Sequence, residues 1–383
     1  MAAAISAARR RASVVICEKM PRLGKKVLAS GNGRCNLTND ILDESFYNSA
    51  SRRLVSSVLS RFGGASIKDF FSGLGLKLYS DGGRVFPVTN QSSSVVSVLE
   101  LELKRLSVPV EKGFCVESVK SAGDGFIVTS GSGRALASRR VILSCGGRSY
   151  PALGSDGGAY AIAGSFGHSL IEPVPAAVAL AVKDPMCQAL QGQKITSAVR
   201  AVSGGRTVRS AKGDLLFTKY GLSGTAIMDI SDEISVDMNR SGRKDVFVSA
   251  DLVPFMEEAA LADEIAGRMR MASHPEDIVA GILPNKFAGP LKDLLKSGDA
   301  GKIAAALKAR RFNVLGTRGW NEAEFTAGGV DTAEVDEITL ESKKREGVYF
   351  SGEMLDVNGA RGGYNLAWAW ASGFIAGEAA ANA

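Results

Sequence analysis

The segment with the clearest chemical signature is the C-terminal one, residues 347 to 383. A short β-type run leads into an acidic, glycine-rich loop, and an apolar helix begins near Asn365. Glycines let backbone N–H groups approach a ligand closely, and a helix N-terminus adds about half a positive charge aimed at it. The pattern therefore predicts a cofactor-binding loop, with candidate binding residues Gly352, Glu353, Asp356, Gly362, Gly363, Tyr364 and Asn365.

A second distinctive string, GKKVLASGNGRCNLTN, runs from Gly24 to Asn39. Its glycines permit tight backbone approach, its arginine is a fixed cation, and its asparagine and threonine offer side-chain hydrogen bonds. Taken alone, Gly-Asn-Gly is also typical of a hairpin turn. For the cysteine we favour a small packed residue over a catalytic thiol, because a catalytic thiol needs a thiolate-stabilising setting that cannot be read from the string. The hairpin is the better explanation of Gly-Asn-Gly alone, and it is the family resemblance described below that makes the following residues candidates for binding: Lys25, Ser30, Gly31, Gly33, Arg34, Cys35, Asn36 and Thr38.

The N-terminal elements that should support these loops begin with a helix at residues 1–11. A buried parallel strand at 12–17 follows and ends in Glu18. In a dinucleotide-binding βαβ unit, such an acidic residue binds a ribose about 20 residues after a glycine-rich phosphate loop. We therefore predict that Glu18 contacts an adenosine ribose, and the adjacent Lys19 is a further candidate for cofactor binding.

Counting back from Glu18 places the first strand and its glycine loop before residue 1. One explanation is that the natural chain begins upstream, with about 10 to 15 further residues that form one strand and a turn. The other is a truncated variant that lacks the pyrophosphate cradle and binds its cofactor poorly. We favour the upstream start, because a decaying protein should have lost other motifs as well.

Further along the chain, residues 52–76 are predicted to be helical, and a serine at 92 or 93 is predicted to cap another helix. The apolar face of that helix is Val95, Leu99, Leu103 and Leu106. Strands are predicted at 114–119, 126–130 and 140–144. Gly146 and Gly147 follow the last of these, at the strand end where open α/β sheets bind ligands.

The pattern changes near residue 182. Alternating segments at 203–208, 213–218, 234–238 and 246–249 predict a small antiparallel sheet or flattened barrel. Residues 254–310 then predict a run of short helices, one of them starting at Pro275. The chain returns to the first domain near Phe325.

Composition limits the remaining possibilities. A chain of 383 residues, 45% hydrophobic and 22% charged, suggests two or three soluble globular domains. No apolar run approaches the roughly 20 residues of a membrane span and no signal-peptide pattern is present, which predicts a cytoplasmic protein without a membrane partner.

Five scattered cysteines and two histidines argue against disulfides and metal sites. A net charge of +6, spread along the chain, argues against nucleic-acid binding. The oligomeric state stays open.

Matched strings at 18–39, 84–93, 146–168, 214–231 and 325–377 resemble bacterial flavoproteins of the aminoacetone-oxidase and BaiN type, within the two-dinucleotide-domain flavoprotein superfamily. The resemblance implies an α/β fold: a Rossmann-like FAD-binding domain with a parallel sheet, interrupted by a β-rich domain and a helical subdomain. The expected boundaries are 1–184 and 327–383 for the FAD-binding domain, 185–252 and 313–326 for the β-rich domain, and 253–312 for the helices.

The same resemblance implies flavin-mediated hydride transfer on a small organic substrate, with NAD(P)H as a candidate electron donor. It places Lys25 and Arg34 near the flavin phosphates or ring and the strand containing Val119 against the adenine. A reduced flavin is anionic at its pyrimidine edge, so a helix N-terminus pointing there favours reduction. Two alternatives stay open: a flavin-deficient, non-catalytic relative, and a tRNA-modifying flavoprotein.

No catalytic acid or base is assigned. Tyr150, Tyr364, His168 and Cys35 are all conceivable from their chemistry, and none has geometric support in the sequence. His168 follows a short predicted helix, where a helix C-terminal cation is the simpler interpretation.

Overall fold

A computed structural model describes the whole chain, residues 1 to 383, and divides it into two compact units. The first unit comprises Met1–Pro173 and Phe325–Ala383, and the second is Val174–Glu324. The predicted insertion of one domain into another is therefore confirmed. The finer boundaries stay a prediction.

The first unit contains parallel strand pairs, as expected for a Rossmann-like domain. β1 (Ile16–Glu18) pairs with β5 (Val110–Lys112), and β9 (Val141–Leu143) pairs with β18 (Val348–Phe350). The two pairs form separate two-stranded sheets, and no strand joins β1 to β18. The upstream strand expected from the sequence stays a prediction. Antiparallel sheets are formed by β2 (Thr38–Asn39), β4 (Arg84–Pro87) and β3 (Leu78–Asp81), and by β6 (Val116–Ala122), β7 (Gly125–Ser130) and β8 (Ala135–Ser138).

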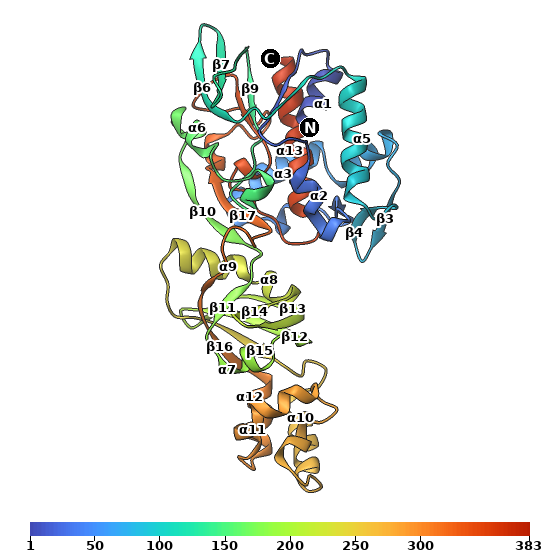
Figure 1. Cartoon of the computed structure of the whole chain (residues 1–383), viewed down its shortest axis with the longest axis vertical. Coiled ribbons are helices and arrows are strands. Elements are labelled where there is room, and N and C mark those ends of the chain that lie inside the picture. The colour runs from blue at the N-terminus through green and yellow to red at the C-terminus, as the bar shows by residue number, and fades with distance from the viewer. The chain divides into compact units, whose positions relative to one another are not determined.

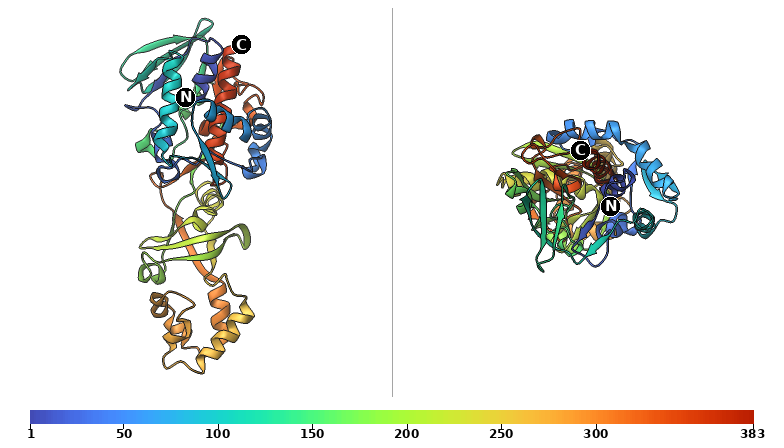
Figure 2. Two further views of the ribbon diagram at one scale, coloured as in Figure 1. Left: turned by 90° about the vertical axis from the view of Figure 1, so that its right-hand side faces the viewer. Right: turned by 90° about the horizontal axis from the view of Figure 1, so that it is seen from above.

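Helix α13 (Tyr364–Asn382) is the central helix of the first unit. It packs against α1 (Ala2–Arg9), and the two helices lie side by side in Figures 1 and 2. A Cβ atom at Gly377 would lie 2.1 Å from the carbonyl oxygen of Ala3, so the close approach requires glycine. The other helices of the unit are α2 (Lys25–Ala29), α3 (Arg52–Arg61), α4 (Gly64–Gly73), α5 (Ser92–Arg105) and α6 (Tyr160–Ser165).

The second unit is built on a closed antiparallel barrel. Around the barrel the strands follow the order β11 (Leu180–Val182), β14 (Gly221–Ser223), β13 (Arg206–Thr218), β12 (Lys194–Ser203), β15 (Val246–Asp251) and β16 (Arg310–Thr317). Phe217 and Phe312 are fully buried in its core. Closure removes the free strand edges that an open sheet leaves exposed. The predicted β-rich domain is thus a barrel.

A helical subdomain extends the barrel core of the second unit. It contains α10 (Glu258–Met269), α11 (Ala288–Leu295) and α12 (Ala300–Lys308), drawn in orange tones in Figure 1. Phe287, just before α11, meets the ring of Phe217 at 5.5 Å between centroids. One hydrophobic core therefore serves both the barrel and the helices. Shorter helices lie next to the barrel in sequence: α7 (Pro185–Ala189), α8 (Thr225–Met228) and α9 (Ser231–Ser235). The chain leaves the first unit along β10 (Leu170–Ala176) and re-enters it with β17 (Phe325–Val330).

Four local predictions are wrong. The buried strand predicted at 12–17 is confined to Ile16–Glu18, and its residues are only half-buried. Residues 234–238 are helical, because acidic Asp232 and Glu233 favour a helix start that a short alternation of apolar residues does not outweigh. Residues 203–208 include the turn between β12 and β13. Ser92 does not cap α5: Gln91 is the N-cap residue, and the Ser92 hydroxyl donates to the carbonyl of Leu28.

Candidate functional site

Helix α13 fixes both glycine-rich loops that the sequence singles out. The indole Nε1 of Trp370 donates to the carbonyl of Leu37 at 3.2 Å, and that of Trp368 donates to the carbonyl of Gly352 at 3.0 Å. The hydroxyl of Ser372 accepts the N–H of Gly352 at 2.9 Å. Both tryptophans are buried, so these bonds are shielded from water and hold the loops on one helix.

The N-terminus of α13 brings together the first group of predicted residues. Gly363 has φ +101°, and a Cβ there would lie 2.4 Å from the carbonyl oxygen of Thr38 and 2.8 Å from Asn36 Oδ1. Asn36 Oδ1 and Thr38 Oγ1 are both buried and have no hydrogen-bond partner in the chain. The preceding residue, Gly362, accepts a bond from Asn39 Nδ2 at 2.9 Å. Two unsatisfied buried oxygens beside a helix N-terminus are what a polar ligand would resolve.

Side chains around this helix end hold the loop in place. The Tyr364 ring stacks on Phe46 at 4.4 Å between centroids, and its carbonyl accepts from the Tyr47 hydroxyl at 2.9 Å. The Asn365 amide bonds both backbone groups of Gly359, at 2.8 and 2.9 Å. The predicted residues Tyr364 and Asn365 therefore have structural partners within the loop.

A second group of residues surrounds Glu353. Its carboxylate accepts from Lys26 Nζ at 2.5 Å and from the backbone N–H of Thr326 at 3.2 Å. Lys26 Nζ also donates to the Ser149 hydroxyl at 2.7 Å. The Glu353 side chain is 15% exposed and that of Lys26 is 32% exposed, so this ion pair is partly shielded from solvent. The network joins the loops 24–39, 146–149 and 352–356.

Gly146 and Gly147 lie beside this second group. A Cβ at Gly146 would lie 2.6 Å from the Ser155 hydroxyl, and one at Gly147 would lie 2.4 Å from Thr326 Oγ1. Protein atoms therefore require glycine at both positions. Their contact with a cofactor stays a prediction. It is supported by a neighbouring candidate residue, since Glu353 Oε2 lies 3.9 Å from the Cβ position of Gly146.

Glu18 is the last residue of β1, as predicted, and Lys19 follows it directly. Glu18 Oε1 accepts the N–H of Met20 at 2.8 Å, and Lys19 forms an ion pair with Asp156 at 2.8 Å. Lys25 Nζ donates to the carbonyl of Ala152 at 3.3 Å. Lys19 and Lys25 thus both bind to the segment 152–156. Asp356, in the C-terminal loop, is 8% exposed and donates its backbone N–H to Val330.

Several predicted residues do not join either group through their side chains. Arg34 stacks over Phe86 at 4.2 Å and donates to Tyr79 Oη at 2.8 Å. Cys35 is fully buried, and burial raises the pKa of its thiol to about 11, so it is a packed thiol as favoured from the sequence. Val119 lies opposite Val128 within the three-stranded antiparallel sheet. The Ser30 hydroxyl donates to Val27, within its own segment.

Two glycines of the GNG string differ in what surrounds them. Gly31 has φ +56°, and a Cβ there would lie 3.0 Å from the backbone nitrogen of Asn36. Gly33 has φ +82°, and no atom lies within 4 Å of its Cβ position. Only Gly33 therefore leaves open space where a ligand could approach the backbone.

The His168 side chain is held by Ser342 and Glu334, which are not among the predicted site residues. Its Nε2 lies 2.6 Å from the Ser342 hydroxyl and its Nδ1 lies 3.2 Å from Glu334 Oε2. Burial lowers its pKa, against the opposing effect of Glu334. Burial therefore disfavours the charged form of His168 that its interpretation as a helix C-terminal cation requires.

Sequence reasoning missed three residues of the second group: Lys26, Ser149 and Thr326. Lys26 was passed over in favour of its neighbour Lys25. Thr326 is 2% exposed and lies within β17, whose other residues are all buried. A threonine in a fully buried strand needs a partner for its hydroxyl, and that requirement could have drawn attention to it.

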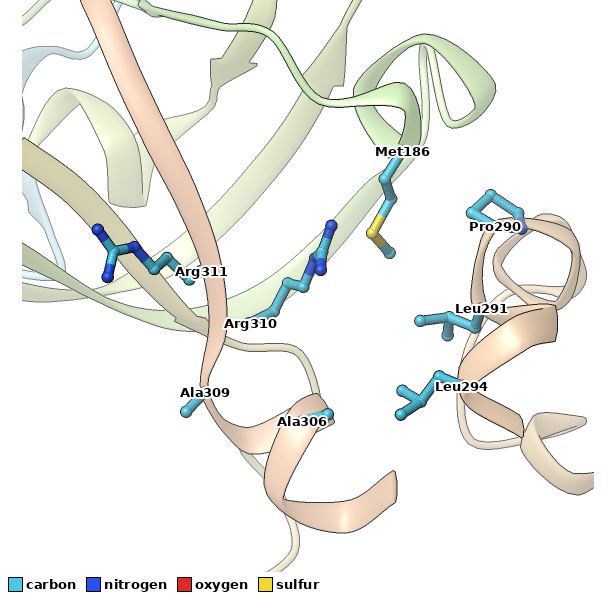
Figure 3. A pocket seen from close by; sticks show the side chains of 8 residues that line it. All are labelled: Met186, Pro290, Leu291, Leu294, Ala306, Ala309, Arg310 and Arg311. Carbon is cyan, nitrogen blue, oxygen red and sulfur yellow. The ribbon is translucent and has the colours of Figure 1, made fainter. Parts of the chain in front are cut away.

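A separate cavity of about 330 Å³ lies within the second unit. Figure 3 shows Arg310 pointing toward Met186 and Leu291, while Arg311 points away. Arg310 forms an ion pair with Asp184 at 2.6 Å, which balances its charge. None of the predicted cofactor-binding residues lines this cavity.

Comparison with known proteins identifies the family. Residues 1–379 match the profile described as "HI0933-like protein Rossmann domain". The chain belongs to the HI0933-like family. It is 38% identical to the 3-dehydro-bile acid delta(4,6)-reductase of Clostridium scindens over 99% of this chain and 96% of that protein. It is 30% identical to the ribosomal RNA dihydrouridine synthase of Escherichia coli over 95% of this chain and 91% of that protein.

Among solved structures, 3-ketosteroid delta1-dehydrogenase from Sterolibacterium denitrificans aligns with a TM-score of 0.52 and 13% identity, covering 100% of this chain and 98% of that one. At this identity the likeness shows the fold alone. The predicted family, the predicted fold class and the prediction of an FAD-dependent oxidoreductase are confirmed. No helix of this HI0933-like protein is both long and apolar enough for a membrane span.

The donor set of the HI0933-like protein suits FAD. The unpartnered Asn36 Oδ1 can accept from a ring N–H group, and the Thr38 hydroxyl can donate or accept. Lys26 and Lys19 supply cations beside glycine loops, which suits a pyrophosphate. These residues, with Glu353, would hold the cofactor.

Proposed function

We propose that this protein reduces a carbon–carbon double bond conjugated to a carbonyl group in a small cyclic substrate of the steroid or bile acid class. The observation that carries this proposal is the 38% identity to a bile acid delta(4,6)-reductase over 99% of the chain. That enzyme is named for reducing double bonds in a 3-oxo compound, and dihydrouridine synthesis also saturates a double bond next to a carbonyl. The two relatives thus have one type of bond change in common.

The proposed reaction transfers two electrons. NAD(P)H is oxidised to NAD(P)⁺, a hydride equivalent reaches the β-carbon of the substrate, and a proton from solvent or a side chain reaches the α-carbon. The products are a saturated carbonyl compound and NAD(P)⁺. When bound, FAD supplies hydride transfer, which no side chain can perform.

The chain's own residues would bind and orient the cofactor and exclude water. We assign Asn36, Thr38 and the α13 N-terminus to the flavin ring, because the two unpartnered oxygens lie beside that helix end. The positive end of the helix stabilises negative charge on a reduced ring. Glu353 with Lys26 is assigned to the ribityl and pyrophosphate portion, and Glu18 to the adenosine ribose.

We do not assign the proton donor, but two of its four candidate residues are disfavoured. Burial raises the pKa of Cys35 to about 11, and its thiol is fully buried. His168 is occupied by Glu334 and Ser342. Burial argues against Cys35 as the proton donor, and its existing partners argue against His168.

Anaerobic turnover of the FAD-loaded protein tests the proposal. We expect oxidation of NADH or NADPH that depends on a 3-oxo-4-ene steroid, with a saturated ketone as product. A control with the corresponding saturated 3-oxo steroid should give no turnover. Yellow protein that oxidises NAD(P)H but saturates no conjugated steroid would overturn the substrate assignment, and colourless protein that rejects FAD would favour the non-catalytic alternative.

A second candidate is reduction of uridine in ribosomal RNA, favoured by the 30% identity to the Escherichia coli synthase over 95% of the chain. Uracil contains a double bond conjugated to a carbonyl, so the same flavin chemistry would serve. Incubation with unmodified ribosomal RNA and NADPH, followed by nucleoside mass spectrometry, distinguishes the two. Dihydrouridine formation without steroid reduction would select this candidate.

A further inference from the structure

We infer that Thr326 is the positioning residue that sets the two FAD-binding loops 146–149 and 352–356 against each other. Its hydroxyl Oγ1 accepts the backbone N–H of Arg148 at 2.8 Å and that of Ser149 at 3.1 Å. Its own backbone N–H donates to Glu353 Oε1 at 3.2 Å. One residue therefore contacts both loops, through its side chain on one side and its main chain on the other.

The Thr326 hydroxyl is the partner of two consecutive backbone donors. Thr326 is 2% exposed, and Ser149 is fully buried. Buried N–H groups that lose their acceptor are costly, so removing this hydroxyl should make the loop rearrange. The loop conformation at Arg148 and Ser149 thus depends on an oxygen from β17, a strand far away in the sequence.

The same contact explains why Gly147 lacks a side chain. A Cβ at Gly147 would lie 2.4 Å from Thr326 Oγ1 and 2.7 Å from Thr326 Cβ. The glycine lets the loop approach the threonine closely enough for its hydroxyl to reach the next two amides. Gly147 and Thr326 therefore form one packing unit.

Glu353 is fixed on two sides by this arrangement. The Thr326 N–H meets one carboxylate oxygen, and Lys26 Nζ meets the other at 2.5 Å. Lys26 also reaches the Ser149 hydroxyl at 2.7 Å, so it contacts a loop that Thr326 already holds. A shift of either loop would change the position of both charged groups. Thr326 itself needs no contact with the cofactor to affect its binding.

This inference rests on the FAD site and not on the proposed substrate. A Thr326→Val substitution replaces the hydroxyl with a methyl group of similar size and keeps the backbone N–H. We expect it to weaken FAD binding by about 10- to 100-fold, the scale of lost buried hydrogen bonds. Thr326→Ser keeps the hydroxyl and should stay within about threefold of the natural protein.

Ser342 provides a matched control. Its hydroxyl also accepts two consecutive backbone N–H groups, from Lys344 at 3.0 Å and Arg345 at 2.8 Å. It belongs to the first unit but to none of the predicted FAD-binding loops. Ser342→Ala should lower the melting temperature of the cofactor-free protein while leaving FAD affinity within about threefold.

FAD affinity is measured by quenching of flavin fluorescence, and melting temperature is measured on the same cofactor-free samples. The inference is overturned if Thr326→Val keeps natural FAD affinity, if Thr326→Ser fails to restore it, or if Ser342→Ala weakens binding equally. Should Thr326→Val fail to fold, amide hydrogen exchange on the natural protein decides. Slow exchange at Arg148 and Ser149 supports the inference, and fast exchange contradicts it. Because none of these measurements uses turnover, failure of the proposed substrate leaves them intact.

Discussion

The two units stabilise their folds in different ways. The second unit closes its strands into a barrel, and its core packs Phe217 against Phe287 and Phe312. The first unit has short strands in separate sheets of two or three, and its loops are held by side-chain bonds from α13. Of the four buried polar side-chain atoms without partners, Asn36 Oδ1 and Thr38 Oγ1 lie in the first unit, and Ser203 Oγ and Arg310 Nε lie at the ends of barrel strands.

Because of this difference, we expect the second unit to contribute mainly to stability and the loops of the first unit mainly to cofactor binding. A closed barrel satisfies its backbone groups within its own ladders, so its stability depends mainly on apolar packing. Loops that carry glycines and unsatisfied oxygens are prepared for a ligand at the expense of intrinsic stability. Substitutions in the two units should therefore change different measured quantities.

The largest loss of unfolding free energy is expected from a substitution in the barrel core. Phe217→Ala removes a fully buried ring that meets two other phenylalanines, and should cost about 3 to 5 kcal/mol of unfolding free energy. Urea denaturation measures this loss. Leu315→Ala, at a side chain 64% exposed on β16, is the matched control and should cost little. If FAD affinity falls as steeply as stability, the proposed separation of roles is wrong.

A somewhat smaller effect is expected at Gly363, where binding and stability should change together. Gly363→Ala places a Cβ 2.4 Å from the Thr38 carbonyl oxygen at a φ of +101°, and we expect a loss of about 2 to 4 kcal/mol. FAD should dissociate more readily, because Asn36 and Thr38 must move. Equilibrium unfolding and flavin fluorescence measure the two effects.

Gly33→Ala is the control for Gly363, since it has the same backbone strain without a clash. Its φ is +82° and no atom lies within 4 Å of the Cβ position. We expect a loss of about 1 kcal/mol in stability. Equal losses at the two glycines would show that strain alone, and not the contact with β2, determines the effect.

The fold was predictable where the sequence pattern is local and repeated. The helix before Glu18, the short helices after residue 254 and the return near Phe325 all follow from periodicity or from strings that resemble the family. The helix at 231–240 was missed because five residues of apolar alternation do not distinguish a strand from a helix. The sequence left an open antiparallel sheet and a flattened barrel as alternatives, since closure depends on pairing between β11 and β16, which are distant in the sequence.

The candidate site was predictable as a set of loops and not as a set of contacts. The glycines were found because their backbone freedom is visible in the sequence. The partnership of Lys26 with Glu353 joins residues 327 positions apart, and no local pattern reports it. Thr326 was hidden for the same reason: its role lies in two amides that belong to another segment.

A substitution at Glu18 is expected to change FAD affinity. Glu18→Ala should weaken FAD binding by about 1 to 3 kcal/mol, the scale of hydrogen bonds to a charged group. Its Oε1 already accepts the Met20 N–H, so part of any loss would come from the strand end. Glu111→Ala on the neighbouring strand β5 is the control, since Glu111 pairs with the exposed Arg134. Unchanged FAD affinity in Glu18→Ala would remove this residue from the site.

The smallest effect concerns the pH dependence of stability at His168. The Ser342 hydroxyl accepts the amides of Lys344 and Arg345, so its own hydrogen must be donated to His168 Nε2. Nδ1 then carries the ring proton and donates to Glu334, whose other oxygen is 3.2 Å from Lys344 Nζ. A second proton on His168 would remove the acceptor that Ser342 uses.

Because burial lowers the His168 pKa below its ordinary value of 6.5, the unfolded chain takes up a proton before the folded one does. The neutral ring's contribution is therefore fully present above pH 6.5 and is lost as the pH falls from there through the lowered pKa of the folded state. Melting temperatures between pH 8 and 5 measure this loss. His168→Gln removes the titration and should flatten that part of the profile, whereas His274→Gln, at an exposed N-cap position, should leave it unchanged. An identical profile in His168→Gln would mean that acid sensitivity arises elsewhere, and that the contact among His168, Ser342 and Glu334 tolerates a charged ring.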